Sequence, residues 1–146
     1  MHDASEDLLT PPFATKVAVL VRDDLEPWQR LNGTAFLVSG VTAANPDLVG
    51  QPYADADGQT YLPLLGMPVL VFEGAAETLT AAHERALRRG TRLAVYTREM
   101  FSTGHDAANR AAVAAVPTAS LDLVGLAVHG PKNGVDRILK GARLHH

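Results

Sequence analysis

The sequence of 146 residues contains no cysteine. This absence excludes disulfides, thiolate catalysis and zinc sites built on cysteine ligands. It fits a reducing compartment, and we expect a cytoplasmic protein. Aromatic residues make up only 5% of the chain, so the core should consist mainly of Val, Leu and Ala.

Three further patterns are missing. No apolar run approaches the roughly 20 residues that span a bilayer, so no membrane association is expected. No glycine-rich phosphate-binding motif occurs, which argues against a nucleotide cofactor, and we predict no cofactor. No pair of histidines has metal-ligand spacing, so no metal site is predicted. With a net charge of −3, the chain as a whole is not built for nucleic acid.

What the sequence does contain is typical of a globular protein, with 47% hydrophobic and 20% charged residues. The first stretch, residues 1–14, is acidic and carries two prolines, and we interpret it as a flexible N-terminal arm. Residues 15–146 show no repeat and no change of composition. They are expected to form a single α/β domain.

Hydrophobic periodicity predicts alternating strands and helices along residues 15–146. The predicted strands cover residues 16–22, 68–72, 92–97 and 121–128. The predicted helices cover residues 27–44, 75–89, 104–116 and 134–140. This alternation is typical of a three-layer α/β/α sandwich. Because the first and last strands are continuously apolar, we expect a mixed, mostly parallel sheet of four to five strands.

Two details of packing are predicted as well. In the helix over residues 27–44, Trp28, Leu31, Ala35 and Val38 make one face, and Gly33 should serve close packing of the helix on a strand. Residues 45–66 are rich in loop formers, and Asp57-Gly58 predicts a small hairpin there. A segment of this length over an α/β core often lies across a site.

The first candidate site is the charged turn after the first strand, formed by Arg22, Asp23 and Asp24. Adjacent carboxylates at the end of a strand can act as a base, bind a cation or orient a histidine. Alternatively, one aspartate caps the following helix and Arg22 pairs with a neighbour.

The helix that follows adds Trp28, Gln29 and Asn32 to this candidate site. Trp28 and Asn32 are four residues apart and share a helix face, so an aromatic wall and amide groups would meet a planar or amide-bearing ligand. The alternative is that Trp28 packs the helix on the sheet or lies at a dimer contact.

A second candidate cluster follows the third strand. His105 and Asn109 lie one helical turn apart, and Ser102 and Thr103 add hydroxyl groups nearby. Imidazole changes charge near neutral pH, so His105 is the candidate general base, with Asp23 or Asp24 orienting it. Alternatively, His105 and Asn109 only satisfy loop carbonyls at the start of a helix.

The last candidate lies in the basic C-terminal stretch. Here Lys132 follows the Gly130-Pro131 turn, and Arg137, Lys140 and Arg143 come after it. Lys132 would position a substrate or contact a phosphate at the start of the helix. The alternative is a solvated helix face.

Two motifs carry a resemblance to known families. The opening KVAVLVRDDL and the closing LVGLAVHGPKNGVDRILKGARL resemble the first and last strands, and their turns, of the type-2 peptidyl-tRNA hydrolase fold. The pattern RDDL-x-x-WQ-x-LN and the HDAAN segment are more similar still to the domain-of-unknown-function 2000 family. The resemblance implies that α/β fold and a homodimer. The aspartate, glutamine and histidine that act in the hydrolases have no counterpart at the matching positions.

We therefore expect a small protein with a remodelled site, and whether it is an enzyme stays open. If it is one, it is hydrolase-like, and His105 with Asp23 or Asp24 performs acid–base chemistry on a small acyl or amide-type substrate. One alternative is a non-catalytic module that binds a metabolite or RNA. Another is peptidyl-tRNA hydrolysis by substitute residues, with tRNA as the less favoured partner.

Overall fold

The computed structural model describes residues 13–145, so the predicted arm over residues 1–14 falls almost wholly outside the described residues. The strands are β1 (Thr15–Arg22), β2 (Tyr53–Ala54), β3 (Thr60–Tyr61), β4 (Val69–Gly74), β5 (Leu93–Thr97), β6 (Leu123–Pro131) and β7 (Arg143–Leu144). The α-helices are α2 (Pro27–Ala44), α3 (Ala76–Arg88), α4 (Asp106–Ala114) and α5 (Lys132–Ile138). Short 3₁₀ helices are η1 (Pro46–Leu48), η2 (Arg98–Ser102) and η3 (Thr118–Ser120). Each predicted strand and helix is present, and β7 is additional.

Five strands form one mixed sheet in the order β5-β6-β1-β4-β7. Only β1 and β4 are parallel; β6 runs antiparallel to both β1 and β5, and β7 antiparallel to β4. The expectation of a mostly parallel sheet is therefore wrong. Continuous apolar runs in β1 and β6 report burial on both faces, and burial does not fix the direction of a strand.

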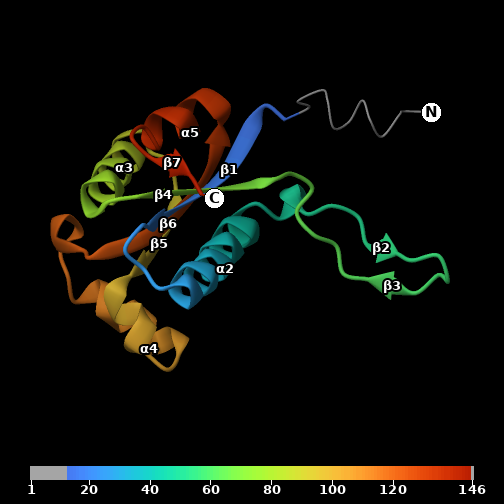
Figure 1. The fold of residues 1–146 in the computed structure, drawn as a ribbon, viewed down its shortest axis with the longest axis horizontal. Helices are drawn as coiled ribbons and strands as arrows, with labels where there is room; N and C mark the ends of the chain where they lie inside the picture. Colours follow the sequence, from blue (N-terminus) through green and yellow to red (C-terminus); the bar gives the residue numbers. More distant parts are fainter. Residues whose placement is uncertain (1–12, 146) are drawn as a thin grey trace.

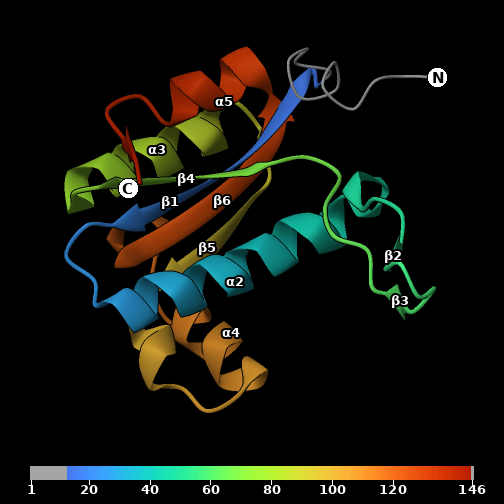
Figure 2. The same cartoon turned by 45° about the vertical axis from the view of Figure 1, so that its right-hand side comes forward.

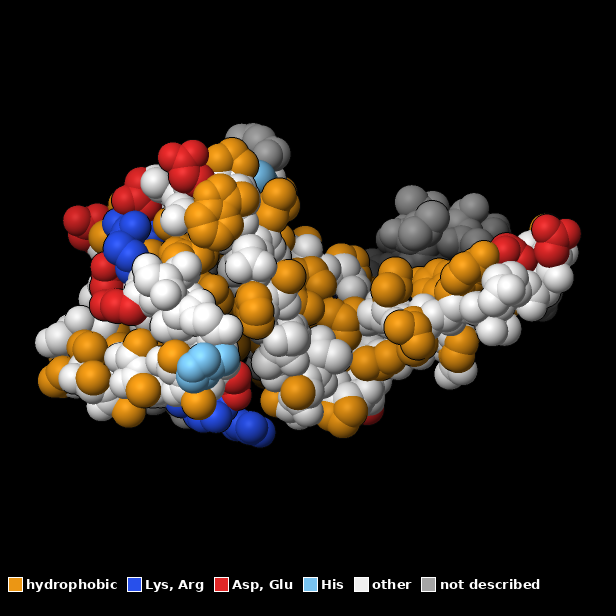
Figure 3. Space-filling view, turned by 90° about the horizontal axis from the view of Figure 1, so that it is seen from below, with side chains coloured by type: hydrophobic (Ala, Val, Ile, Leu, Met, Phe, Trp, Pro, Cys, Tyr) orange, Lys and Arg blue, Asp and Glu red, His pale blue; other side chains and the backbone are white. Residues whose placement is uncertain are grey.

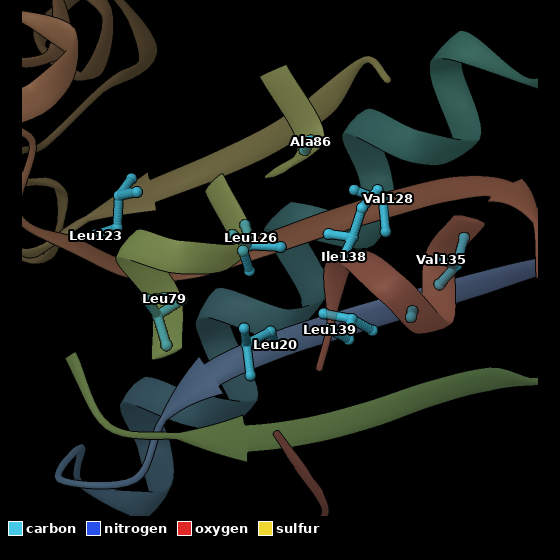
Figure 4. Close-up of a cluster of buried hydrophobic side chains, with 11 residues drawn as sticks. Leu20, Leu79, Ala86, Leu123, Leu126, Val128, Val135, Ile138 and Leu139 are labelled. Atoms are coloured by element: carbon cyan, nitrogen blue, oxygen red, sulfur yellow. The ribbon is translucent and has the colours of Figure 1, made fainter. Parts of the chain in front are cut away.

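Helices cover both faces of this sheet, as Figures 1 and 2 show. Along β1, Ala18 and Leu20 face a core formed with α3 and α5, and Figure 4 shows the side chains of this cluster. The alternate residues Val17, Val19 and Val21 face a second core formed with α2. Because side chains alternate across a strand, one strand supplies both cores.

Helix α2 begins at Pro27, where the ring suits the first helical position, and it ends before Pro46. Its buried face consists of Gly33, Leu37 and Val41. The predicted face is instead largely turned outward, since Trp28 is 56% exposed and Leu31 is 74% exposed.

The close approach of α2 to the sheet occurs at a different glycine from the one predicted. A Cβ atom at Gly33 would have no neighbour within 4 Å, whereas one at Gly125 in β6 would lie 2.8 Å from Leu37 Cδ1. The sheet therefore supplies one glycine that admits α2, and Gly40 of the helix supplies another, where a Cβ atom would lie 3.2 Å from Ala94 Cβ in β5.

The hairpin predicted from Asp57-Gly58 is confirmed, with Tyr53 paired to Tyr61 and Gly58 at φ +83°. Asp55 organises it: one carboxylate oxygen accepts the backbone N–H groups of Asp57 and Gln59 at 3.0 Å each. The other accepts the Tyr61 hydroxyl at 2.6 Å, and this bond is the main cause that lowers the pKa of Asp55. The hairpin projects away from the sheet rather than across a site (Figures 1 and 2).

Within residues 13–145, none of the helices combines the length and the apolar character that crossing a bilayer demands.

Candidate functional site

A groove of about 900 Å³ lies between α2 and α4, with β5 and η2 at its base. Figure 3 shows this hollowed face of the molecule, with hydrophobic side chains gathered around it. A volume of this size is within the range of small-molecule pockets, about 300–1,000 Å³. The lining residues that matter below are Trp28, Asn32, Phe36, Tyr96, Phe101, Thr103, His105, Asn109 and Arg110.

Aromatic side chains form a continuous series along the groove. Trp28 meets Phe101 edge to face at 5.6 Å between ring centroids, Phe101 lies 4.9 Å from Tyr96, and Tyr96 lies 6.0 Å from Phe36. The chain has one Trp, three Tyr and four Phe residues, and four of these eight line the groove. A protein poor in aromatic residues thus concentrates half of them at one surface.

Polar groups interrupt this apolar lining at a few positions. The Thr103 hydroxyl bonds the Met100 carbonyl oxygen at 3.0 Å and also the side-chain amide of Asn109, which holds that amide at the groove. Burial raises the pKa of the Tyr96 phenol, so this hydroxyl keeps its proton at neutral pH. No other residue of the described range 13–145 accepts a hydrogen bond from it.

His105 caps helix α4. Its Nδ1 accepts the backbone N–H of Ala108 at 3.2 Å. The neutral ring must then carry its proton on Nε2, because the Nδ1 lone pair is already engaged. In this state the imidazole can donate a hydrogen bond to a ligand but offers no free lone pair to a substrate proton.

The charged turn after β1 lies outside the groove. Arg22 binds both carboxylate oxygens of Asp24, at 3.1 and 2.7 Å, and this hydrogen bonding is the largest cause that lowers the pKa of Asp24. Asp122 accepts from Arg22 at 3.5 Å and from Arg98 at 3.2 Å. The turn is held together by its own opposite charges.

Asp23 is engaged elsewhere, with Arg143 at 3.1 Å. Among the described residues, neither Asp23 nor Asp24 hydrogen-bonds His105. The expected hydrogen bond between His105 and one of these carboxylates is therefore not formed. Each carboxylate is bound by an arginine instead.

The other predicted residues divide between the groove and other places. Trp28, Asn32, Thr103 and Asn109, predicted to contact a substrate, line the groove together with His105, the predicted general base. Their roles stay predictions. Gln29 instead accepts the Glu26 backbone N–H at 2.9 Å, and Ser102 does not line the groove. Lys132 opens α5, in the helix layer on the opposite face of the sheet, so it does not reach this site.

Sequence reasoning missed Phe36, Tyr96, Phe101 and Arg110 as lining residues. The available signal was composition: in a chain with few aromatics, Phe101 and Tyr96 flank the turn that leads to His105. Within residues 13–145, no group of three His, Asp or Glu side chains gathers in a way that could hold a metal ion.

Comparison with known proteins supplies relatives but no activity. The chain is similar to the solved structure of a protein of unknown function, Atu0240, from Agrobacterium tumefaciens strain C58. The two are 44% identical, with a TM-score of 0.90 over 92% of this chain and 99% of the other. No curated protein matches the chain. A family of proteins of unknown function, DUF2000, matches residues 15–146, and the chain therefore belongs to that family.

Proposed function

We propose that the chain binds a small, planar and largely apolar molecule in the groove between α2 and α4. The observation that carries this proposal is the aromatic series Trp28, Phe101, Tyr96 and Phe36 around a hollow of about 900 Å³. Aromatic walls with few polar groups favour a flat apolar body whose orientation is fixed by one or two hydrogen bonds.

The polar groups of the groove define the other part of the ligand. His105 donates from Nε2, the Tyr96 hydroxyl donates, and the amides of Asn32 and Asn109 both donate and accept. Donors therefore dominate, and they match a carbonyl, carboxylate or carboxamide oxygen. An aromatic acid or amide combines both requirements.

Binding without chemistry is favoured over acid–base catalysis for two reasons. The Nδ1 lone pair of His105 is engaged with Ala108, and a general base needs a free lone pair within reach of the substrate. Asp23 and Asp24 are held by Arg143 and Arg22, respectively. Acid–base chemistry on an acyl or amide substrate, the peptidyl-tRNA hydrolase fold and tRNA hydrolysis itself stay predictions without a test.

The single tryptophan provides the experiment, because Trp28 lies in the groove and is half-exposed. Phenylacetate and phenylacetamide are titrated while Trp28 emission is followed, and binding is confirmed by isothermal titration calorimetry. We expect saturable binding that Phe101→Ala weakens by about tenfold or more, since a lost aromatic contact and its buried area exceed about 1.4 kcal/mol.

Leu62→Ala is the matched control, because Leu62 is also a large exposed hydrophobic residue (84% exposed) but lies outside the groove. It should leave the affinity unchanged. If neither compound, nor any member of a library of aromatic acids and amides, binds with a dependence on Phe101, the proposal is wrong.

We also carry forward the homodimer implied by the resemblance. Large apolar side chains stay exposed on α2 and beside the hairpin, and they include Leu31, Tyr53, Leu62 and Leu64. Large apolar side chains on a hairpin that projects from the domain favour contact with a second copy. Light scattering decides the question: the wild type should have twice the monomer mass, and a Leu62→Asp, Leu64→Asp variant should be monomeric.

A further inference from the structure

Four arginines line a second, smaller pocket on the other side of the sheet. Arg85, Arg88 and Arg89 come from the end of α3, and Arg137 comes from α5, which packs beside α3 on that face (Figures 1 and 2). The pocket has a volume of about 300 Å³. The chain has a net charge of −3, so a cluster of four arginine side chains is not expected from its overall charge.

Within residues 13–145, these arginines have no acidic partner at ion-pair distance. The arginines at the charged end of the sheet all pair with carboxylates, as Arg22, Arg98 and Arg143 do. By contrast, among residues 13–145 no carboxylate comes within ion-pair distance of the four pocket arginines. The described part of the chain therefore forms no close ion pair with these four guanidinium groups.

Capping of a helix end accounts for the position of one of the four arginines but not for the other three. Arg85 donates to the carbonyl oxygens of Ile138 and Lys140, at 3.3 and 2.9 Å, and so completes the end of α5. At the end of α3 the carbonyls of Ala86 and Leu87 are already bound by backbone N–H groups of Thr91 and Gly90.

The side chains of Arg88, Arg89 and Arg137 are therefore available to a ligand. Arg89 lies against the backbone of α5, where a Cβ atom on Gly134 would be 3.5 Å from one of its terminal nitrogens. This places the guanidinium group of an exposed arginine beside α5.

We propose that this pocket binds the phosphate group of a small phosphorylated molecule. Guanidinium groups present parallel N–H donors that match phosphate oxygens, and several of them around one hollow neutralise a doubly charged group. The volume is at the lower end of the range for small ligands, which suits one or two phosphoryl groups. The site is independent of the groove, because the sheet and both cores separate them.

The test uses inorganic phosphate and pyrophosphate with the full chain, measured by calorimetry at low ionic strength. We expect pyrophosphate to bind more tightly than phosphate, because it presents more charge to the same donors. Arg88→Gln with Arg137→Gln should weaken pyrophosphate binding by about a hundredfold, at roughly tenfold per charge-assisted contact. Both side chains are exposed, so the double variant should melt like the wild type.

Arg98→Gln is the control, since it removes the same charge from an arginine outside the pocket. It should leave pyrophosphate affinity unchanged, and pyrophosphate should leave Trp28 emission unchanged. Absence of binding at low salt, or binding that the double variant does not weaken, would overturn the proposal. A short single-stranded RNA that binds more tightly than pyrophosphate through the same arginines would replace the small ligand with nucleic acid.

Discussion

Two turns lie at the same end of the sheet, one after β1 and one after β5. Both strands point the same way, because each runs antiparallel to β6, which lies between them. The turn after β1 is made of opposite charges that bind one another. The turn after β5 is made of aromatic and small polar side chains around a groove. Arg98 is shared, since it opens η2 and yet pairs with Asp122 beside the first turn.

The difference shows that a polar group stays available to a ligand only where the protein offers it no hydrogen-bond or ion-pair partner nearby. Carboxylates placed beside arginines satisfy each other, and the resulting pairs are structural. Polar groups placed among apolar neighbours, such as the Tyr96 hydroxyl, keep hydrogen-bonding capacity for a molecule from outside. Formal charge in a sequence is therefore a weaker guide to a site than the neighbours of each polar group.

The largest expected effect comes from α2, the helix that begins after the first turn and contacts the second through Trp28 and Phe101. Leu37 is 2% exposed and packs α2 against β6, so Leu37→Ala should lower the free energy of unfolding by about 3 kcal/mol, measured by urea denaturation. Leu31→Ala, on the opposite face of α2, should change it by less than about 0.5 kcal/mol. Equal losses would mean that α2 sits on the sheet in another orientation.

A smaller effect is expected at the cap of α4. His105→Ala should lower the free energy of unfolding by about 1 kcal/mol, because it leaves the Ala108 N–H without its side-chain acceptor. His105→Asn supplies another good cap and should restore most of the loss. If the alanine and asparagine variants are equally stable, His105 does not act as the cap and is free for other chemistry.

At the charged turn, we expect Asp24→Asn to lower the free energy of unfolding by only about 0.5 kcal/mol, since the Asp24 side chain is half-exposed and solvent weakens its pair with Arg22. The pKa of Asp24 is lowered in the fold, so its stabilisation is present above the ordinary aspartate pKa of 3.8 and is lost as pH falls through the folded value. The variant should lack this acid-dependent part. It should also bind groove ligands like the wild type; a large loss of binding would join the two turns functionally.

The smallest expected effect is on the pH dependence of stability, and it comes from His83 on the opposite face of the sheet. Burial in α3 lowers the pKa of His83, and Glu84 opposes part of this shift. The unfolded chain therefore takes up the proton first, and stability should fall as pH drops below about 6.5. His83→Gln should flatten the stability curve between pH 7 and the folded pKa, in about the range where histidine titrates. An unchanged curve would show that His83 is solvated.

Much of the fold follows from local chemistry in the sequence. Pro27 and Asn45-Pro46 mark both ends of α2, and Asp57-Gly58 marks the hairpin. The directions of the strands could not be predicted from the sequence, because the apolar runs of β1 and β6 look alike whether the neighbouring strands are parallel or antiparallel. The predicted inward face of α2 was also wrong, because Gly125, the residue of β6 against which Leu37 packs, is far from α2 in the sequence and gives no local signal for the contact.

The site was predicted in part. Trp28, Asn32, Thr103, His105 and Asn109 do meet in one groove, although about eighty positions separate its two segments. The partnership of His105 with Asp23 or Asp24 could not be judged from residue types, because it depended on where Arg22 and Arg143 would lie. The C-terminal Arg143 reaches Asp23 only through the short edge strand β7.

The groove has unequal walls. Helix α2 is anchored by Leu37 and Val41, whereas no residue of α4 is buried. We therefore expect α4 to move away from α2 at a small cost in free energy. The groove could then bind ligands larger than its present volume, while the strands beneath keep their register. Amide hydrogen exchange should then be fast along α4, slow along α2, and slowed on α4 alone once the groove is filled.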